Sequence, residues 1–324
     1  MLEIYKSKEK QSKDKTIHVI ERVSEIGDDC WINLHAPTEE EITLIQEKLD
    51  VPKEFLCYPL DDEERPRVDI DEYNGDTLII IDIPYFQHDD QPNLYETVPL
   101  GIIITKRQLI TVSLRDVPMF DSYINNQVKD LIVNYRNRFA IQILLSVAKE
   151  YLRLLRFIDK TIESSERELA KTTTNRELYR LLELSKTLVY FSTSLKSDEA
   201  VLEKLMRGHT IRQYSEDEEL LDDVIIEFKQ AREMADIYTS VVSHTMEAYA
   251  SIINNNMNEI MKIMAAATIA LSVPTIISSF FGQNCPMPWD AGFTSNPIPF
   301  IILLVAGFVS VICAISILKK HRML

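Results

Sequence analysis

The chain has only seven glycines in 324 residues, which argues against a fold with many tight turns and favours long helices. Its four cysteines show no paired spacing, so they predict neither a disulfide framework nor a zinc site. The six histidines include no His-x-x-x-His pair, and no glycine-rich phosphate loop or nucleophile elbow occurs. Nothing in the sequence therefore supports an enzyme or a bound organic cofactor.

Positive charge is also scarce. The net charge is −15, and residues 1–257 hold 31 Lys+Arg against 48 Asp+Glu. An acidic domain repels nucleic acid and concentrates cations, although ordinary solubility explains any single acidic residue. The polar start, MLEIYKSKEKQSKDK, has no signal-peptide pattern. We expect no nucleic-acid partner.

Residues 1–118 predict a mixed α/β domain. A helix should begin after Thr38, because Thr38 and Glu41 have the spacing of a capping box. Asn74-Gly75 lies between two apolar runs and predicts a β-hairpin. Strand-like runs occur at 17–20, 30–34, 68–70, 77–81, 98–105 and 109–114.

Residues 119–257 predict a helical hairpin and the first part of a long stalk helix. An apolar stripe at helical spacing begins at Leu131, and residues 171–175 interrupt it. A second helix should cover 176–206. The third has no glycine or proline from 211 to 273, which predicts one helix from about 215 to 281. It would be roughly 100 Å long, against about 30 Å for a bilayer core, so most of it should project into the cytoplasm.

Residues 258–324 contain two long apolar runs and predict a transmembrane hairpin. The spans should lie at about 262–281 and 298–318, joined by a loop that opens with Gly282-Gln283-Asn284. The loop has no positive residue, whereas Lys319, Lys320 and Arg322 follow the second span. The positive-inside rule then places both termini in the cytoplasm of a multi-pass protein of the cell membrane.

The first span has a face that a simple anchor does not need. Small, hydroxyl-bearing and amide residues recur there at helical spacing, which fits either close helix packing or a wet pore lining. Two spans cannot enclose a pore, so a pore requires an oligomer. The second span is uniformly apolar and suits an outer, lipid-facing ring. This face consists of Asn258, Met261, Met264 or Ala265, Thr268, Ser272, Thr275 and Ser279.

Pro274 lies in the middle of the first span. Proline lacks a backbone donor and can kink a helix. We expect the neighbouring Ser272 and Thr275 hydroxyls to bond the carbonyls that it frees.

Several motifs together resemble the CorA family of divalent-cation transporters over nearly the whole chain. Gly282-Gln283-Asn284 stands where the family has Gly-Met-Asn, and Met287-Pro288 follows where the family has Met-Pro. The remaining matches are Trp31-Ile32-Asn33-Leu34, Glu64-Arg65-Pro66-Arg67-Val68, residues 255–264 and the basic tail 319–322.

The resemblance implies an α+β cytoplasmic domain, a stalk helix and two C-terminal transmembrane helices, assembled as a funnel-shaped homopentamer in a lipid bilayer. It implies a selectivity filter of Gly282, Gln283 and Asn284. A ring of Asn284 amides can bond the waters of Mg²⁺, which dehydrates reluctantly. Pore-lining positions would be Asn258, Met261, Met264, Thr268, Ser272, Thr275 and Phe281.

Two departures from the family pattern concern selectivity and regulation. Gln283 replaces the usual Met of the signature. The family pairs acids across protomers to bind regulatory metal; Asp223, with Asp222 beside it, falls at one position, but Cys57 and Tyr58 replace the partner Glu-Asp. The acids at 61–64 could substitute, or simply form a solvated loop.

We therefore expect a channel that takes up Mg²⁺ through a central pentameric pore. A transporter of Zn²⁺, Co²⁺ or Ni²⁺ with the same fold is the first alternative. A membrane-anchored scaffold or sensor without conduction is the second.

Overall fold

A seven-stranded sheet forms the centre of the N-terminal part, in the order β2-β1-β3-β7-β6-β5-β4. β3 and β7 pair in parallel, whereas the other neighbours pair antiparallel. β4 and β5 form the predicted hairpin, and Gly75 adopts the positive φ of 75° that its turn requires. The strands are β1 Leu2–Ser12, β2 Lys15–Val23, β3 Cys30–His35, β4 Arg67–Ile70, β5 Thr77–Phe86, β6 Tyr95–Ile104 and β7 Leu109–Ser113.

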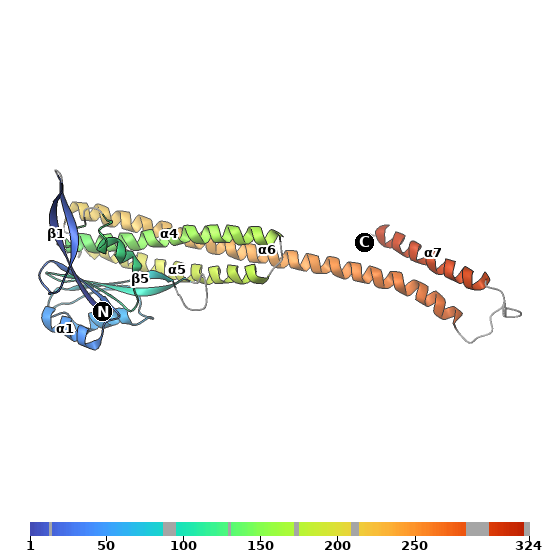
Figure 1. Ribbon diagram of the computed structural model, residues 1–324, viewed down its shortest axis with the longest axis horizontal. Helices are drawn as coiled ribbons and strands as arrows, with labels where there is room; N and C mark the ends of the chain where they lie inside the picture. Colours follow the sequence, from blue (N-terminus) through green and yellow to red (C-terminus); the bar gives the residue numbers. More distant parts are fainter. Residues whose placement is uncertain are drawn as a thin grey trace. The chain divides into compact units, whose positions relative to one another are not determined.

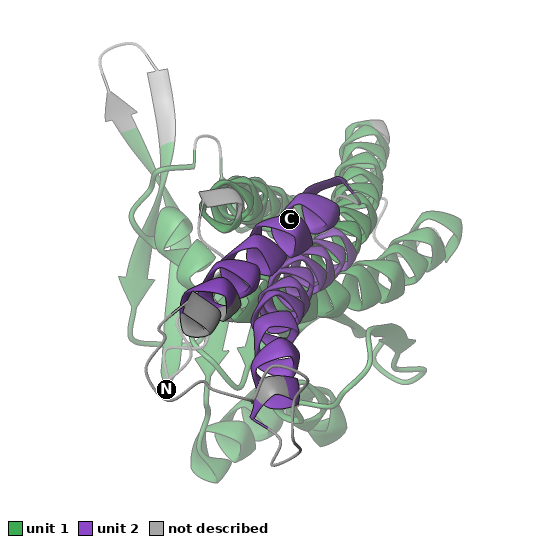
Figure 2. Cartoon of the chain, turned by 90° about the vertical axis from the view of Figure 1, so that its right-hand side faces the viewer, with its two compact units in different colours: residues 1–246 green, residues 247–324 purple. Residues whose placement is uncertain are grey.

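This computed structural model describes residues 1–12, 15–86, 95–128, 131–171, 175–208, 214–282 and 298–320. The chain divides into a first unit, Met1–Met246, and a second unit, Glu247–Leu324 (Figure 2). The boundary lies inside one helix, α6 (Ser215–Phe281). The domain limits expected at residues 118 and 257 stay predictions.

Two short helices cover one face of the sheet. α1 (Glu39–Leu49) begins with the predicted capping box, because the Thr38 side chain accepts from the Glu41 amide and Glu41 accepts from the Thr38 amide. α2 (Lys53–Cys57) continues into a 3₁₀ turn, η1 (Tyr58–Leu60). Their apolar side chains share one core with inward-facing residues of β5, β6 and β7. The helices contribute Ile42, Ile45, Phe55 and Leu56, and the strands contribute Leu78, Ile80, Ile103 and Ile110.

Long helices lie along the other face, as Figure 1 shows. They are α4 (Arg136–Lys171) and α5 (Asn175–Gly208). Polar contacts tie α5 to two strands, β6 and β4. The Thr187 hydroxyl accepts from the Tyr95 amide, the Ser194 hydroxyl bonds that of Thr97, and Lys204 donates to the Val68 carbonyl. The first part of α6 buries a stripe of apolar side chains at helical spacing, which includes Leu221, Val224, Phe228, Ala231, Ala235 and Val242.

An aromatic cluster closes the space between the sheet and α4. Trp31 is fully buried, and its ring centroid lies 5.1 Å from those of Tyr5 and Phe120 and 5.3 Å from that of Phe139. Its indole nitrogen donates to the Thr111 hydroxyl at 2.9 Å. The 3₁₀ turn η2 (Pro118–Phe120) and the short helix α3 (Asp121–Ile124) supply part of this cluster.

The first long helix differs from its expected start. The apolar stripe begins at Leu131, but α4 begins at Arg136. The amide of Val133 instead donates to the Ser7 hydroxyl at 2.9 Å, so a contact with β1 holds this segment outside the helix. The expected interruption is confirmed, because α4 ends at Lys171 and α5 begins at Asn175.

Candidate functional site

The face expected to line a pore lies on α6, and its described side chains are exposed in the single chain. Met261 and Met264 are 61% and 65% exposed although both are apolar. Asn258, Thr268, Ser272 and Thr275 are exposed as well. Steps of three and four residues place these side chains on one side of the helix.

Three hydroxyls on this face donate to the backbone of their own helix. Thr268 donates to the Met264 carbonyl at 2.9 Å, Ser272 to that of Thr268 at 2.7 Å and Thr275 to that of Leu271 at 2.8 Å. Each hydroxyl oxygen still has accepting lone pairs, because a hydroxyl has one proton and two lone pairs.

These bonds correct the expectation for Pro274. A proline at this position deprives the carbonyl of Ala270, four residues earlier, of its usual amide donor. Ser272 and Thr275 bond the carbonyls of Thr268 and Leu271 instead. α6 nevertheless continues through Pro274 to Phe281.

A hollow of about 640 Å³ lies along the same face. All of its lining residues belong to α6, so one chain provides only one wall. An enclosed path along it would need walls from further chains. The lining residues are Thr268, Leu271, Ser272, Thr275, Ile276, Ser279 and Phe280.

The predicted filter is only partly described. Gly282 follows the last residue of α6, and its amide donates to the Ser278 and Ser279 carbonyls at 3.0 and 3.2 Å. Gln283 and Asn284 lie outside the described residues, as does the side chain of Phe281. The filter residues therefore stay predictions.

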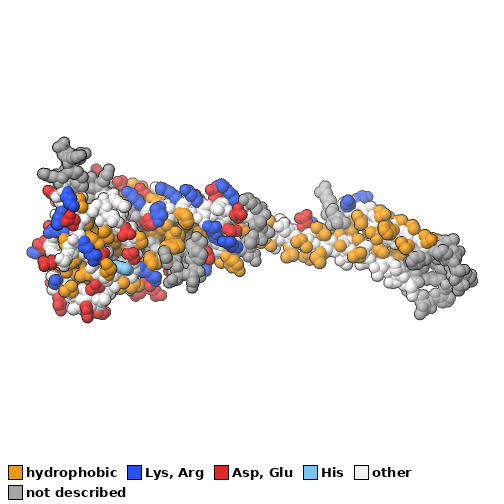
Figure 3. Space-filling model, in the orientation of Figure 1, with side chains coloured by type: hydrophobic (Ala, Val, Ile, Leu, Met, Phe, Trp, Pro, Cys, Tyr) orange, Lys and Arg blue, Asp and Glu red, His pale blue; other side chains and the backbone are white. Residues whose placement is uncertain are grey.

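The second unit exposes a large apolar surface. Among the described residues, one helix, Glu216–Phe280, is long and apolar enough to cross a membrane. α7 (Ile298–Lys320) confirms the helix expected at 298–318, and its Ile302, Phe308 and Ile317 are exposed. In Figure 3 charged side chains gather over the first unit, whereas apolar and uncharged side chains dominate the second. Apolar surface of this extent marks contact with lipid or with other chains.

The expected regulatory acids, Asp222 and Asp223, lie side by side in the sequence and are exposed on α6. No group of three or more His, Cys, Asp or Glu residues that could hold a metal occurs in the part of the chain that the structure describes. Cys57 is partly buried, which raises the pKa of its thiol. The ring of Tyr58 lies 4.5 Å from the Arg67 guanidinium.

Three of the four acids at 61–64 are engaged in their own neighbourhood. Asp62 pairs with Arg115 at 3.5 Å, and Glu64 forms an ion pair with Arg67. The Asp61 carboxylate accepts from the amide of Glu63 at 3.0 Å. These contacts favour a structural role for the loop over the alternative metal-binding role.

Among the buried acids, Asp198 and Asp76 were not identified as candidates from the sequence. Asp198 is fully buried on α5, and Asp76 is 3% exposed beside the β4–β5 turn. Asp198 follows the buried Leu195 by three residues and precedes the buried Leu202 by four, so its place on an apolar face was a usable signal. Asp76 follows a turn glycine, where an acid is ordinary, and carries no such signal.

Comparisons with known proteins agree with this arrangement. The family model described as "CorA-like Mg2+ transporter protein" matches residues 28–320. The cobalt/magnesium transport protein CorA of Methanocaldococcus jannaschii is 28% identical over 295 residues, which cover 90% of each chain.

Solved structures are similar as well. The complete CorA magnesium transporter of M. jannaschii matches with a TM-score of 0.81 and 25% identity, covering 99% of this chain and 98% of that one. The ZntB cytoplasmic domain of Vibrio parahaemolyticus covers 78% of this chain and 98% of its own, with a TM-score of 0.60. At 12% identity this second likeness concerns the fold alone.

Proposed function

Because the chain belongs to the family of CorA-like Mg²⁺ transporter proteins, we propose that it takes up Mg²⁺ through a pore formed by five copies of α6. Membership supports divalent-cation transport as the general activity. The observation that carries the proposed pore is the exposed face of α6 from Asn258 to Thr275. In a single chain this face has an open hollow, accepting oxygens and two uncovered methionines.

The chemistry of this face suits an ion that keeps its water. Mg²⁺ dehydrates reluctantly, and its first-shell waters donate hydrogen bonds outward. The hydroxyl oxygens of Thr268, Ser272 and Thr275 accept such bonds. At the outer end, rings of Asn284 and Gln283 amides would receive the hydrated ion without trapping it by charge.

The same face also supplies a means of closure. Rings of Met261 and Met264 would form an apolar constriction, and a narrow apolar pore closes by losing its water. Phe281 would line the outer end next to Gly282. Asn258 would form a polar ring at the cytoplasmic exit.

The proposed topology places the first span at about 262–281 and the second at about 298–318. α7 ends at Lys320, and Lys319 and Lys320 favour a cytoplasmic C-terminus. An inward-negative potential then drives uptake, at roughly 4.6 kcal/mol per 100 mV for a divalent cation, twice the single-charge figure.

We propose a regulatory role for Asp222 and Asp223. Cytoplasmic Mg²⁺ between protomers would relieve repulsion among these exposed acids and favour the closed state. Protection of the full chain from a protease should then increase with millimolar Mg²⁺. Equal digestion with and without Mg²⁺ would mean that the substitution of Cys57 and Tyr58 has removed this switch.

Ion flux into liposomes tests the function. The full chain is reconstituted, an inside-negative potential is applied, and uptake of Mg²⁺, Co²⁺, Ni²⁺ and Zn²⁺ is followed with trapped indicators. We expect Mg²⁺ uptake. Zn²⁺ uptake without Mg²⁺ uptake would instead support the alternative cargo, and absence of all divalent uptake would support a scaffold or sensor.

A filter variant separates conduction from packing. Asn284→Ala should reduce Mg²⁺ uptake, whereas Ser316→Ala, on the second span outside the proposed pore face, should not. Unchanged uptake in Asn284→Ala would contradict the proposed filter. Gln283→Met, which restores the family's usual residue, should change the relative uptake of the four ions if Gln283 contributes to selectivity.

A further inference from the structure

A polar cavity of about 530 Å³ lies in the first unit, far along the chain from the proposed pore face. Four segments line it: the loop at 26–28 before β3, the end of α1 at 48–50, the β4–β5 turn and the β6–β7 turn at 105–108. These segments meet at one end of the sheet. A cavity of this size accommodates a small ligand or an ion with its water shell.

Asp76 is the unusual residue of this cavity. It lines the space, yet it is only 3% exposed. Among the described residues no hydrogen bond or ion pair joins its carboxylate to a partner. Burial and the charge of Asp71 raise its pKa to about 6, Lys106 opposes this shift, and Asp50 adds to it. The carboxylate lines the cavity. A cationic ligand there would favour its charged form, which partial burial and the charge of Asp71 disfavour.

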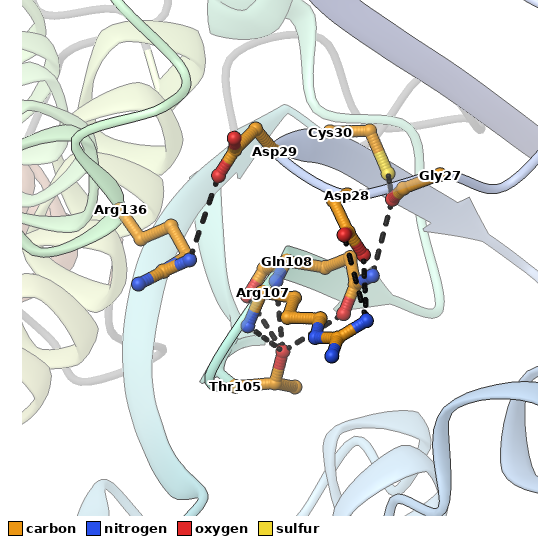
Figure 4. A network of polar contacts seen from close by, with 8 residues as sticks. All are labelled: Gly27, Asp28, Asp29, Cys30, Thr105, Arg107, Gln108 and Arg136. Atoms are coloured by element: carbon orange, nitrogen blue, oxygen red, sulfur yellow. Dashed lines mark hydrogen bonds and ion pairs between the residues drawn. The ribbon is translucent and has the colours of Figure 1, made fainter.

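One wall is held in place by the contacts drawn in Figure 4. The Thr105 hydroxyl accepts from the amides of Arg107 and Gln108 at 3.2 and 2.8 Å. The Gln108 side chain donates to the Gly27 carbonyl at 3.1 Å, and Arg107 pairs with Asp28 at 3.3 Å. The wall is therefore formed without a ligand, and the Arg107 charge is already matched by a carboxylate.

The facing wall brings further acids near Asp76. The Asn74 amide donates to the Asp71 carboxylate at 2.8 Å, and the Asn74 side chain donates to the Asp50 carbonyl at 2.7 Å. Asn74 thus forms hydrogen bonds with both neighbouring acids, Asp50 and Asp71. Asp50 itself lines the cavity, in a left-handed conformation with φ of 57°. Lys48 and Lys106 also line it, but both are exposed and their ammonium groups can extend into solvent.

We propose that this cavity binds a divalent cation with much of its water shell, with Asp76 as the buried carboxylate and Asp50 as the second contact. A hydrated ion fits the geometry better than a bare one. The described residues hold no group of three ligands placed for direct coordination, and the cavity is much larger than a dehydrated ion. Mg²⁺ in proteins often keeps several waters and uses only one or two carboxylates.

Mn²⁺ titration of the full chain in detergent, read by electron paramagnetic resonance, tests the proposal. At pH 7.5 the wild type should bind one more Mn²⁺ per chain than Asp76→Asn, and Mg²⁺ should displace it. Glu72→Gln is the matched control, because Glu72 is an exposed acid of the same turn that does not line the cavity. It should bind as the wild type does. Mn²⁺ ions bound at other sites contribute equally to the wild type and to Asp76→Asn. The difference in stoichiometry therefore does not depend on the pore.

A second variant keeps the test decisive if Asp76→Asn folds poorly. Lys106→Ala removes an exposed positive charge from the cavity rim and should lower the Mn²⁺ dissociation constant by roughly tenfold. Equal Mn²⁺ stoichiometry in wild type and a folded Asp76→Asn would overturn the site. Weaker Mn²⁺ binding in Lys106→Ala would overturn it too, because the cavity would then not favour cations.

Discussion

Asp198 on α5 accepts a 2.9 Å hydrogen bond from the backbone amide of Asp82 on β5. Asp198 is fully buried, and its second carboxylate oxygen is also buried and has no hydrogen-bond partner among the described residues. Burial and the nearby charge of Asp82 raise the pKa of Asp198 well above its ordinary value. The folded chain therefore holds a proton on Asp198 that the unfolded chain releases above about pH 4.

The first prediction concerns the pH dependence of stability. A raised pKa of an acid stabilises the fold fully below the ordinary value of 3.8, and this stabilisation is lost as pH rises toward the folded-state pKa. Asp198→Asn cannot ionise. The melting temperature of the full chain in detergent should therefore fall less between pH 5 and pH 8 in Asp198→Asn than in the wild type.

The matched control for this prediction is Asp159→Asn, which changes an exposed acid on α4. It should keep the wild-type pH dependence. Between pH 5 and pH 8 we expect Asp198→Asn to lose less stability than the wild type does, because its amide stays neutral without binding a proton. The same slope in all three proteins would contradict a protonated Asp198.

A second prediction follows from the close approach of Gly101 to Pro59. A Cβ atom on Gly101 would lie 2.2 Å from Cγ and 2.9 Å from Cβ of Pro59, so β6 or η1 would have to move. Gly101→Ala should cost about 1–3 kcal/mol, as overpacking of a core does. Thermal melting measures the loss. Gly27→Ala, with nothing within 4 Å of the new atom, should melt almost as the wild type.

Pro59→Ala supplies the complementary test, because it removes the ring that the new methyl group would meet. In the Gly101→Ala background this second change should recover part of the lost stability. If Gly101→Ala alone melts at the wild-type temperature, the close packing of η1 on β6 is not what requires glycine here.

Local chemistry made part of the fold predictable from the sequence. The capping box at Thr38 and the hairpin at Asn74-Gly75 depend on neighbouring residues, and both are confirmed. β1 was not predicted, because its Lys-rich sequence has little apolar alternation. Its strand is completed by pairing with β2, the next strand along the chain, on one side and with β3 on the other. Tertiary pairing of this kind overrides local preference.

The candidate functional residues were likewise predictable from the sequence only in part. The helical spacing of Asn258, Thr268 and Thr275 was visible in the sequence, because a face is a periodic property. The face is exposed in the single chain. That is what we expect of a surface that other chains cover in an oligomer. The cavity around Asp76 was not predictable. It depends on four segments that the fold brings together from distant parts of the chain.

The third prediction tests the accepting oxygens of α6. Ser272→Ala should lower Mg²⁺ uptake by about tenfold, which corresponds to roughly 1.4 kcal/mol of added barrier. Its control is Ser316→Ala on α7, where the hydroxyl donates to the Ile312 carbonyl at 2.8 Å in the same i to i−4 manner. Both variants lose the same helix contact, so liposome flux separates pore lining from helix stability. Equal uptake in the two variants would count against the pore face.

The fourth prediction tests the proposed methionine constriction. Met264→Ser makes an exposed apolar position polar, and water should then remain in the narrow part of the pore. Basal Mg²⁺ uptake should rise by about tenfold, the equivalent of roughly 1.4 kcal/mol less barrier. Ile263→Ser, at an exposed neighbour outside the proposed face, should not raise uptake. A rise of the same size in both would indicate general loosening of the helix.

The hydroxyl bonds on α6 have a consequence for the sign of the ion. Thr268, Ser272 and Thr275 direct their protons at their own backbone. In this arrangement they can accept hydrogen bonds but have no proton to donate. Chloride or phosphate needs donors to replace its hydration, so under the proposed pore these positions would reject anions although none of them carries a charge.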